Sequence, residues 1–169
     1  GAVKKILQTS SELGTLYRRG KLTANEFWDR AKALSKIKAV NKDLNRLWFE
    51  SYETIEGTIE IIKKLKEKGI KLYFLSDNVK ERVEYLEEKY DFIRNFIDGI
   101  FSHKVHKTKL DGTDVFKLTL RMTKEKPENV VYIDDKEEYV KTAKKLGMNV
   151  ILFKSPEQLK EELRKLVFD

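Results

Sequence analysis

Two adjacent carboxylates, Asp134 and Asp135, follow a run of Val, Val, Tyr and Ile at residues 130–133. Such a run is typical of a buried strand. Two like charges at the end of a buried strand cost free energy unless a cation or a hydrogen-bond donor meets them. Mg²⁺ is such a cation, because it prefers oxygen ligands and commonly accompanies phosphate groups. The simpler alternative is that the strand ends in solvent and both carboxylates are hydrated.

Polar groups also follow two other apolar runs. Ser76, Asp77 and Asn78 come after "KLYFL", and the segment 102–109 comes after "IDGIF". The carboxyl ends of parallel strands lie at one edge of a sheet, where ligands bind. A hydroxyl from Ser76 and an ammonium from the second segment can hold phosphate. Together with the carboxylate pair, they indicate metal-assisted chemistry on a small phosphorylated molecule.

The elements that would position these groups alternate along the chain from Ile55 onward. Alternation of strand and helix predicts a parallel sheet covered by helices. Before residue 53 the pattern is helical, and Thr23 with Glu26 predicts a capping box. The expected helices span 54–69, 78–90, 112–123, 137–147 and 155–166, and the expected strands span 70–76, 97–102, 129–134 and 149–153.

Composition excludes several kinds of site. The 169 residues include no cysteine and only two histidines, His103 and His106, which excludes disulfides and makes a multi-histidine zinc centre improbable. The net charge is +7, but Lys and Glu alternate along helical faces, so a dedicated nucleic-acid surface is not expected. No apolar run is long enough to cross a membrane and no secretory signal is present, so we expect a cytoplasmic protein.

The segments "KLYFLSDN", "FSHKVHKTKLDGTDVFKLTL" and "VVYIDDKEEYVKTAKKLGMNVILF" resemble the second, third and fourth motifs of the haloacid dehalogenase-like (HAD) hydrolase superfamily. The fourth match is the most specific and includes the Ala143 to Gly147 signature. The resemblance implies an α/β fold with a Rossmann-like parallel sheet over 55–169. The helical residues 1–54 resemble the cap that many of these enzymes insert on the N-terminal side.

The resemblance also implies roles for individual residues. Ser76 and Lys109 would contact the phosphate as catalytic residues, and Asn78 would contact the substrate. Asp135 would bind Mg²⁺ directly and Asp134 through water. Plainer alternatives are helix capping for Ser76 and Asn78 and a solvated loop lysine for Lys109.

The third motif departs from the family pattern. Leu110 replaces the usual proline and one extra residue precedes Phe116, so Lys107 remains an alternative to Lys109. In the fourth motif, Tyr139 stands where a polar amide is common. His103 and His106 are interpreted as loop residues, and Trp28, Trp48 and Phe49 as packing residues.

The family's first motif, Asp-x-Asp-x-Thr, is not found. It supplies the nucleophile and its strand lies mid-sheet, between the strands that end at Ser76 and Asp134. "SELGTL" and "KLDGTDVF" resemble it in part, but the first fits a helix and the second fits the third motif. We interpret the given sequence as starting after that strand, with a degenerate family member as the alternative.

The expected function is that of an Mg²⁺-dependent phosphatase acting on a small phosphorylated metabolite through a phosphoaspartyl intermediate, with the nucleophile outside the given sequence. Dehalogenase and phosphomutase chemistries remain open, because the family includes them. The alternatives from other classes are a catalytically inactive interaction module and a polyanion-binding domain. No membrane partner is expected, and neither the substrate nor the oligomeric state can be predicted.

Overall fold

The structure, a computed structural model, describes residues 11–35 and 37–167. It divides into two compact units, each assembled from separate stretches of the chain. The division into 1–54 and 55–169 stays a prediction, since the first unit also takes in stretches beyond residue 54. The first unit contains residues up to 53 with 74–94 and 99–108, and the second contains 54–73, 95–98 and residues from 109 onward.

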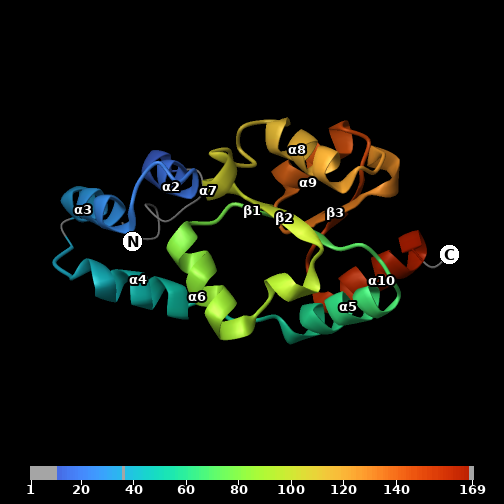
Figure 1. Cartoon of the computed structure of the whole chain (residues 1–169), viewed down its shortest axis with the longest axis horizontal. Coiled ribbons are helices and arrows are strands. Elements are labelled where there is room, and N and C mark those ends of the chain that lie inside the picture. The colour runs from blue at the N-terminus through green and yellow to red at the C-terminus, as the bar shows by residue number, and fades with distance from the viewer. Residues whose placement is uncertain (1–10, 36, 168–169) are drawn as a thin grey trace. The chain divides into compact units, whose positions relative to one another are not determined.

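The first unit is built from helices, and side-chain caps set the starts of the first two of those described. Ser11 accepts a hydrogen bond of 3.0 Å from the N–H of Gly14. Thr23 and Glu26 form the predicted capping box, because the Thr23 N–H donates to the Glu26 carboxylate and the Glu26 N–H donates to the Thr23 hydroxyl. The helices are α2 (Glu12–Arg18), α3 (Ala24–Ser35), α4 (Asn41–Glu50), α6 (Lys80–Tyr90) and α7 (Ser102–Val105) (Figure 1).

Aromatic side chains fill the core of the first unit. Tyr17 and Phe27 stack with ring centroids 4.5 Å apart, and Phe27 meets Trp28 edge-on at 5.0 Å. Trp48 and Phe49 are buried in the same cluster. The indole N–H of Trp28 donates to Asn45, so its polar end is satisfied. Trp28, Trp48 and Phe49 therefore pack the core, as predicted.

The second unit is centred on two parallel strands, β3 (Val131–Asp134) and β4 (Asn149–Leu152). Their register pairs Val131 with Asn149 and Asp134 with Leu152. The helices on the two sides of the strands are α5 (Glu56–Glu67) with α10 (Pro156–Val167), and α8 (Asp114–Thr123) with α9 (Glu137–Lys145).

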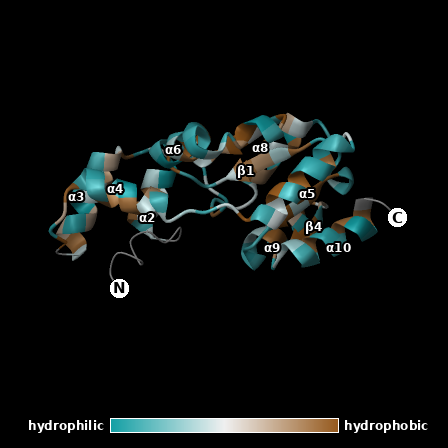
Figure 2. Ribbon diagram, turned by 90° about the horizontal axis from the view of Figure 1, so that it is seen from below, coloured by the Kyte–Doolittle hydropathy of each residue, from teal (hydrophilic) through white to brown (hydrophobic). Residues whose placement is uncertain are grey.

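Alternation along β3 decides which residues face which helices. Val131 and Ile133 pack into the apolar cluster of α5 and α10, whereas Tyr132 meets Phe116 of α8 edge-on at 5.3 Å. Figure 1 shows α8 and α9 on one side of β3 and α5 with α10 on the other. Figure 2 shows hydrophilic and hydrophobic residues alternating along α5 and α10, as expected for helices that cover strands on one face only.

The remaining strands, β1 (Tyr73–Ser76) and β2 (Asp98–Phe101), form a second two-stranded sheet. The described strands thus make two small sheets instead of the one sheet that strand–helix alternation predicts. No helix in the described ranges is long and apolar enough to cross a membrane.

Most predicted elements are present, with shorter strands and one added helix. β1 begins at Tyr73 instead of residue 70, because Gly69 follows α5 with a φ of +75° and the chain needs further residues to become extended. His103 lies in α7, so its interpretation as a loop residue was wrong, whereas His106 follows the helix as its C-cap in a left-handed turn. Ser155 caps α10 as predicted, accepting from the N–H of Gln158.

Candidate functional site

The end of β3 presents one carboxylate that is fully engaged by donors. Asp134 follows Tyr132 by two residues, so both side chains lie on the same face of the strand. The Tyr132 hydroxyl donates to Oδ2 of Asp134 at 2.7 Å, and the backbone N–H of Lys136 donates to Oδ1 at 2.9 Å. The first of the two acids is therefore held in a fixed orientation.

Lys109 completes this arrangement from the segment between α7 and α8. Its Nζ donates to Oδ2 of Asp134 at 2.6 Å, and the two side chains are only 11% and 8% exposed. The same ammonium lies 4.7 Å from the ring centroid of Tyr139 on α9, a cation–π distance. The structure thus brings two predicted site residues, Lys109 and Asp134, into direct contact.

The surroundings of Asp134 lower the pKa of its carboxyl group. Burial alone would raise this pKa, but the charge of Lys109 and the hydrogen bonds from Lys109, Tyr132 and the Lys136 N–H more than offset that effect. Asp134 is therefore ionised at neutral pH and paired with a cation of the protein itself.

Asp135 differs from its neighbour in every one of these respects. Its side chain is exposed, and within the described residues it takes part in no hydrogen bond or ion pair. An exposed carboxylate fits a hydrated Mg²⁺, which keeps several waters and needs few protein ligands. No group of three His, Cys, Asp or Glu side chains suited to a metal occurs among the residues that the structure describes. Those residues therefore offer one open ligand and not a closed site.

Ser76 and Asn78 lie in the first unit, which is described by itself. Ser76 ends β1, and α6 begins after Val79 without any side-chain cap, so Ser76 does not cap that helix. The side-chain oxygen of Asn78 accepts from the Val79 N–H and from Nε of Arg82. Asn78 therefore bonds to the residues at the start of α6 without capping the helix, and its contact with a substrate stays a prediction.

The loop after β1 is tied to other elements of the first unit through Ser102. The Ser102 hydroxyl accepts from the N–H of Asn78 at 3.0 Å and donates to the carbonyl of Arg18 at 2.7 Å. The Nδ1–H of His103 donates to the Asn78 carbonyl at 2.9 Å. Burial lowers the pKa of His103, and this hydrogen bond opposes the effect only in part. His103 is therefore a neutral structural residue.

The chain matches the family model described as haloacid dehalogenase-like hydrolase over residues 9–153. It belongs to this family. Two curated relatives are named Enolase-phosphatase E1. The protein of Aquifex aeolicus is 30% identical over 125 residues, which is 69% of this chain and 55% of that protein. The protein of Persephonella marina is 25% identical over 138 residues, or 76% and 59% of the two. The chain thus spans somewhat more than half the length of these relatives.

Solved structures of HAD family members share the fold. A HAD family enzyme of Bacteroides thetaiotaomicron superposes with a TM-score of 0.79 at 20% identity, covering 96% of this chain and 82% of that one. Its complex with magnesium and inorganic phosphate gives 0.76 at 19% identity, covering 90% and 79%. A HAD-like hydrolase of Porphyromonas gingivalis gives 0.80 at 18% identity, covering 100% and 84%. At such identities the similarity shows the HAD-like fold alone.

Sequence reasoning missed three side chains around these groups. Tyr132 could have been found, because it precedes Asp134 by two residues on an expected strand and so shares its face. Tyr139 was noted as a departure from the family pattern, but its contact with Lys109 depends on how α9 packs. Arg82 left no signal, since a helix of mixed Glu, Lys and Arg predicts exposed cations and not a buried one.

Proposed function

We propose that this HAD-family chain carries part of the active site of a phosphatase for a small phosphorylated metabolite. The observation that supports this most strongly is the ion pair of Lys109 with Asp134 beside the open carboxylate of Asp135. An ion pair that only stabilised the fold would not need an exposed acid next to it. A cation held firmly at a strand end is suited to binding a phosphoryl group.

Each residue has a distinct part in this proposal. Lys109, fixed by Asp134, donates to a phosphoryl oxygen, and Ser76 at the end of β1 hydrogen-bonds a second oxygen. Asp134 orients Lys109, while Asp135 is a ligand for Mg²⁺. When bound, Mg²⁺ would supply electrostatic stabilisation of the phosphoryl group. A family-type nucleophile would form a phosphoaspartyl intermediate, but no Asp-x-Asp occurs in the 169 residues.

Two lysines compete for the role given to Lys109, and mutation separates them. The experiment uses the polypeptide as the genome encodes it, including any residues before Gly1, assayed with Mg²⁺ on p-nitrophenyl phosphate and a panel of sugar and nucleotide phosphates. Lys109→Met should lower kcat by roughly 10²–10³, the usual effect of removing one electrostatic contact to the transition state. Lys107→Met is the matched control and should retain turnover.

The other outcomes assign other functions. Turnover lost with Lys107→Met and retained with Lys109→Met would move the phosphate contact to Lys107. Folded protein that binds Mg²⁺ but hydrolyses nothing would favour the interaction module. The lack of an Asp-x-Asp in the 169 residues is consistent with that alternative. The 169-residue chain by itself should show no turnover. Activity in that chain that Asp111→Asn or Asp134→Asn abolishes would place the nucleophile within it.

A further inference from the structure

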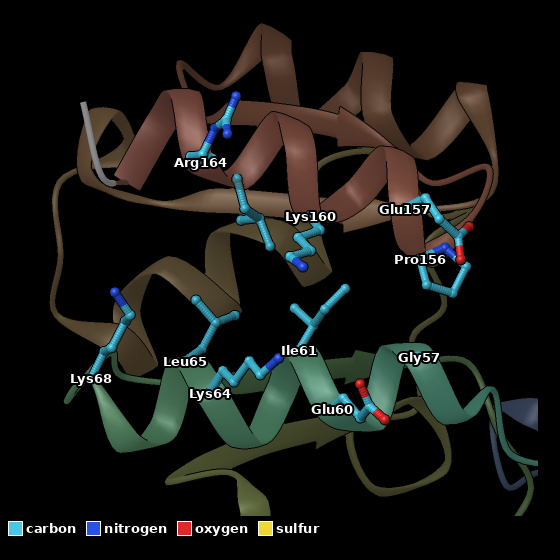
Figure 3. Close-up of a pocket in the computed structure, with 11 residues that line it drawn as sticks. Gly57, Glu60, Ile61, Lys64, Leu65, Lys68, Pro156, Glu157, Lys160 and Arg164 are labelled. Carbon is cyan, nitrogen blue, oxygen red and sulfur yellow. The ribbon is translucent and has the colours of Figure 1, made fainter.

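A groove of about 360 Å³ lies between α5 and α10 of the second unit (Figure 3). Its apolar lining comes from Ile61, Leu65 and Leu163, and the last two are buried in the cluster that packs against β4. One end is closed, because a Cβ added to Gly57 would lie 2.7 Å from a side-chain carbon of Pro156. None of these residues belongs to the site at the end of β3.

Two ammonium groups face this groove from opposite helices. Both lysines line the groove, and Figure 3 shows Lys160 of α10 extended into the space between the helices and Lys64 lying along α5 with its ammonium beside Ile61. Within the described part of the chain neither lysine takes part in an ion pair. Over the whole lining, four cations (Lys64, Lys68, Lys160 and Arg164) outnumber two carboxylates (Glu60 and Glu157). The groove therefore combines an apolar lining with an excess of positive charge.

We propose that this groove binds a medium-chain aliphatic carboxylate. The chain would lie against Ile61, Leu65 and Leu163, and the head group would lie between Lys64 and Lys160. The volume of about 360 Å³ lies at the lower end of the range for small-molecule sites, which suits a ligand of medium length. Apolar lining with a few convergent polar groups is the usual composition of small-molecule sites.

Charge and shape distinguish this occupant from two others. A second copy of the chain would bring the same excess of positive charge against itself, which repulsion opposes. A partner helix would have to extend beyond both ends of the groove, but Gly57 and Pro156 close one end. A single anionic head group with a short chain meets neither obstacle. The inference does not depend on the phosphatase proposal.

Calorimetric titration of the chain with decanoate tests this, with decyltrimethylammonium as the ligand of opposite charge. Decanoate should bind saturably and shift the methyl resonances of Ile61, Leu65 and Leu163. The Lys64→Glu/Lys160→Glu variant should raise its Kd by at least about tenfold, since charge-assisted contacts are lost and repulsion replaces them. Lys144→Glu/Lys145→Glu on α9 is the control for the same change in net charge and should leave the Kd within about twofold.

Three results would overturn the proposal. Equal affinity for decyltrimethylammonium would show non-specific apolar binding, and an unchanged Kd in Lys64→Glu/Lys160→Glu would place decanoate elsewhere. Self-association that the same two substitutions abolish would make a second copy the occupant. Ile61→Trp, which fills the groove and leaves both lysines, should also abolish decanoate binding. This variant tests the proposal even if Lys64→Glu/Lys160→Glu does not fold.

Discussion

The ammonium of Lys109 lies 2.6 Å from Oδ2 of Asp134, and little of either side chain reaches solvent. Removing two charges from water costs several kcal/mol per ion, and the attraction between them offsets this cost only where further hydrogen bonds satisfy the pair. Tyr132 and the Lys136 N–H provide such bonds to Asp134. The pair is therefore tolerable when complete and costly when broken.

Lys109→Met should destabilise the chain by about 3–5 kcal/mol, because it leaves a buried carboxylate without its cation. Urea unfolding at neutral pH measures this loss. Combining Lys109→Met with Asp134→Asn should recover part of it, since no buried charge then remains unpaired. Lys141→Met breaks an exposed pair with Glu137 and should leave the unfolding midpoint unchanged. If Lys109→Met loses as little stability as Lys141→Met, the pair of Lys109 with Asp134 is exposed to solvent in solution.

The lowered pKa of Asp134 predicts a pH dependence of stability. In the unfolded chain this carboxyl takes up a proton near its ordinary value of 3.8, before the folded form does. Its stabilising contribution is therefore fully present above that pH and is lost as the pH falls through the lower folded pKa.

Comparing the chain with Asp134→Asn from pH 6 downward isolates this contribution, because the difference in unfolding free energy should shrink as the acid form takes over. Tyr132→Phe removes one of the donors that lower this pKa. The folded pKa then lies closer to the unfolded value, so the loss should be smaller and complete at a higher pH in this variant. A constant difference down to pH 2 would contradict the assignment.

Local sequence patterns predicted the elements of the second unit well. Apolar runs marked β3 and β4, and Ser155 with Pro156 marked the start of α10. From the sequence we could expect only that Lys109 and Asp134 lie near the same edge of a sheet, and this expectation came from the strand pattern and from the resemblance to the family. Its distance and its burial depend on tertiary packing that one sequence does not encode locally.

The buried cation of the first unit shows where local reasoning ends. Arg82 sits in α6 among charged residues, and helical periodicity gives no reason to bury it. Its partners Asn78, Tyr52 and Trp48 come from different stretches of the chain. Only the docking of α4 against α6 creates this environment, so sequence patterns could not have predicted it.

Arg82→Ala should destabilise the first unit far more than Arg82→Met. The guanidinium carbon lies 4.6 Å from the Trp48 ring centroid and 4.5 Å from that of Tyr52, and burial lowers the pKa of this group to about 10. It thus stays charged at neutral pH. Methionine keeps much of the packing volume, and the hydrogen-bond partners that it leaves behind, Asn78 and Tyr52, are neutral groups, so no unpaired charge is created there.

Alanine leaves a cavity at this position, at a cost of about 2–5 kcal/mol for a long side chain. Thermal unfolding ranks the two variants, and Trp48 fluorescence reports loss of the cation in both. Equal destabilisation by methionine and alanine would show that the charge and its hydrogen bonds matter more than the packing.

Asp135→Asn should abolish binding of divalent cations to the 169-residue chain, whereas Asp43→Asn should leave it unchanged. Asp135 is exposed and has no competing donor among the described residues, while Asp134 is already engaged by three donors. A hydrated ion can therefore bind weakly through Asp135. Mn²⁺ broadening of backbone amide resonances locates such an ion, and the signals of Asp135 and Lys136 should broaden first.

If the proposed phosphate contact of Lys109 is right, inorganic phosphate should tighten this binding, and the coupling must be reciprocal. Measuring Mn²⁺ affinity with and without phosphate, in the native chain and in Lys109→Met, separates this effect from simple ion pairing in solution. Broadening that survives Asp135→Asn would place the ion elsewhere. If Asp135→Asn abolishes the broadening but phosphate does not change the Mn²⁺ affinity of the native chain, Asp135 remains a metal ligand and Lys109 is not part of a phosphate site.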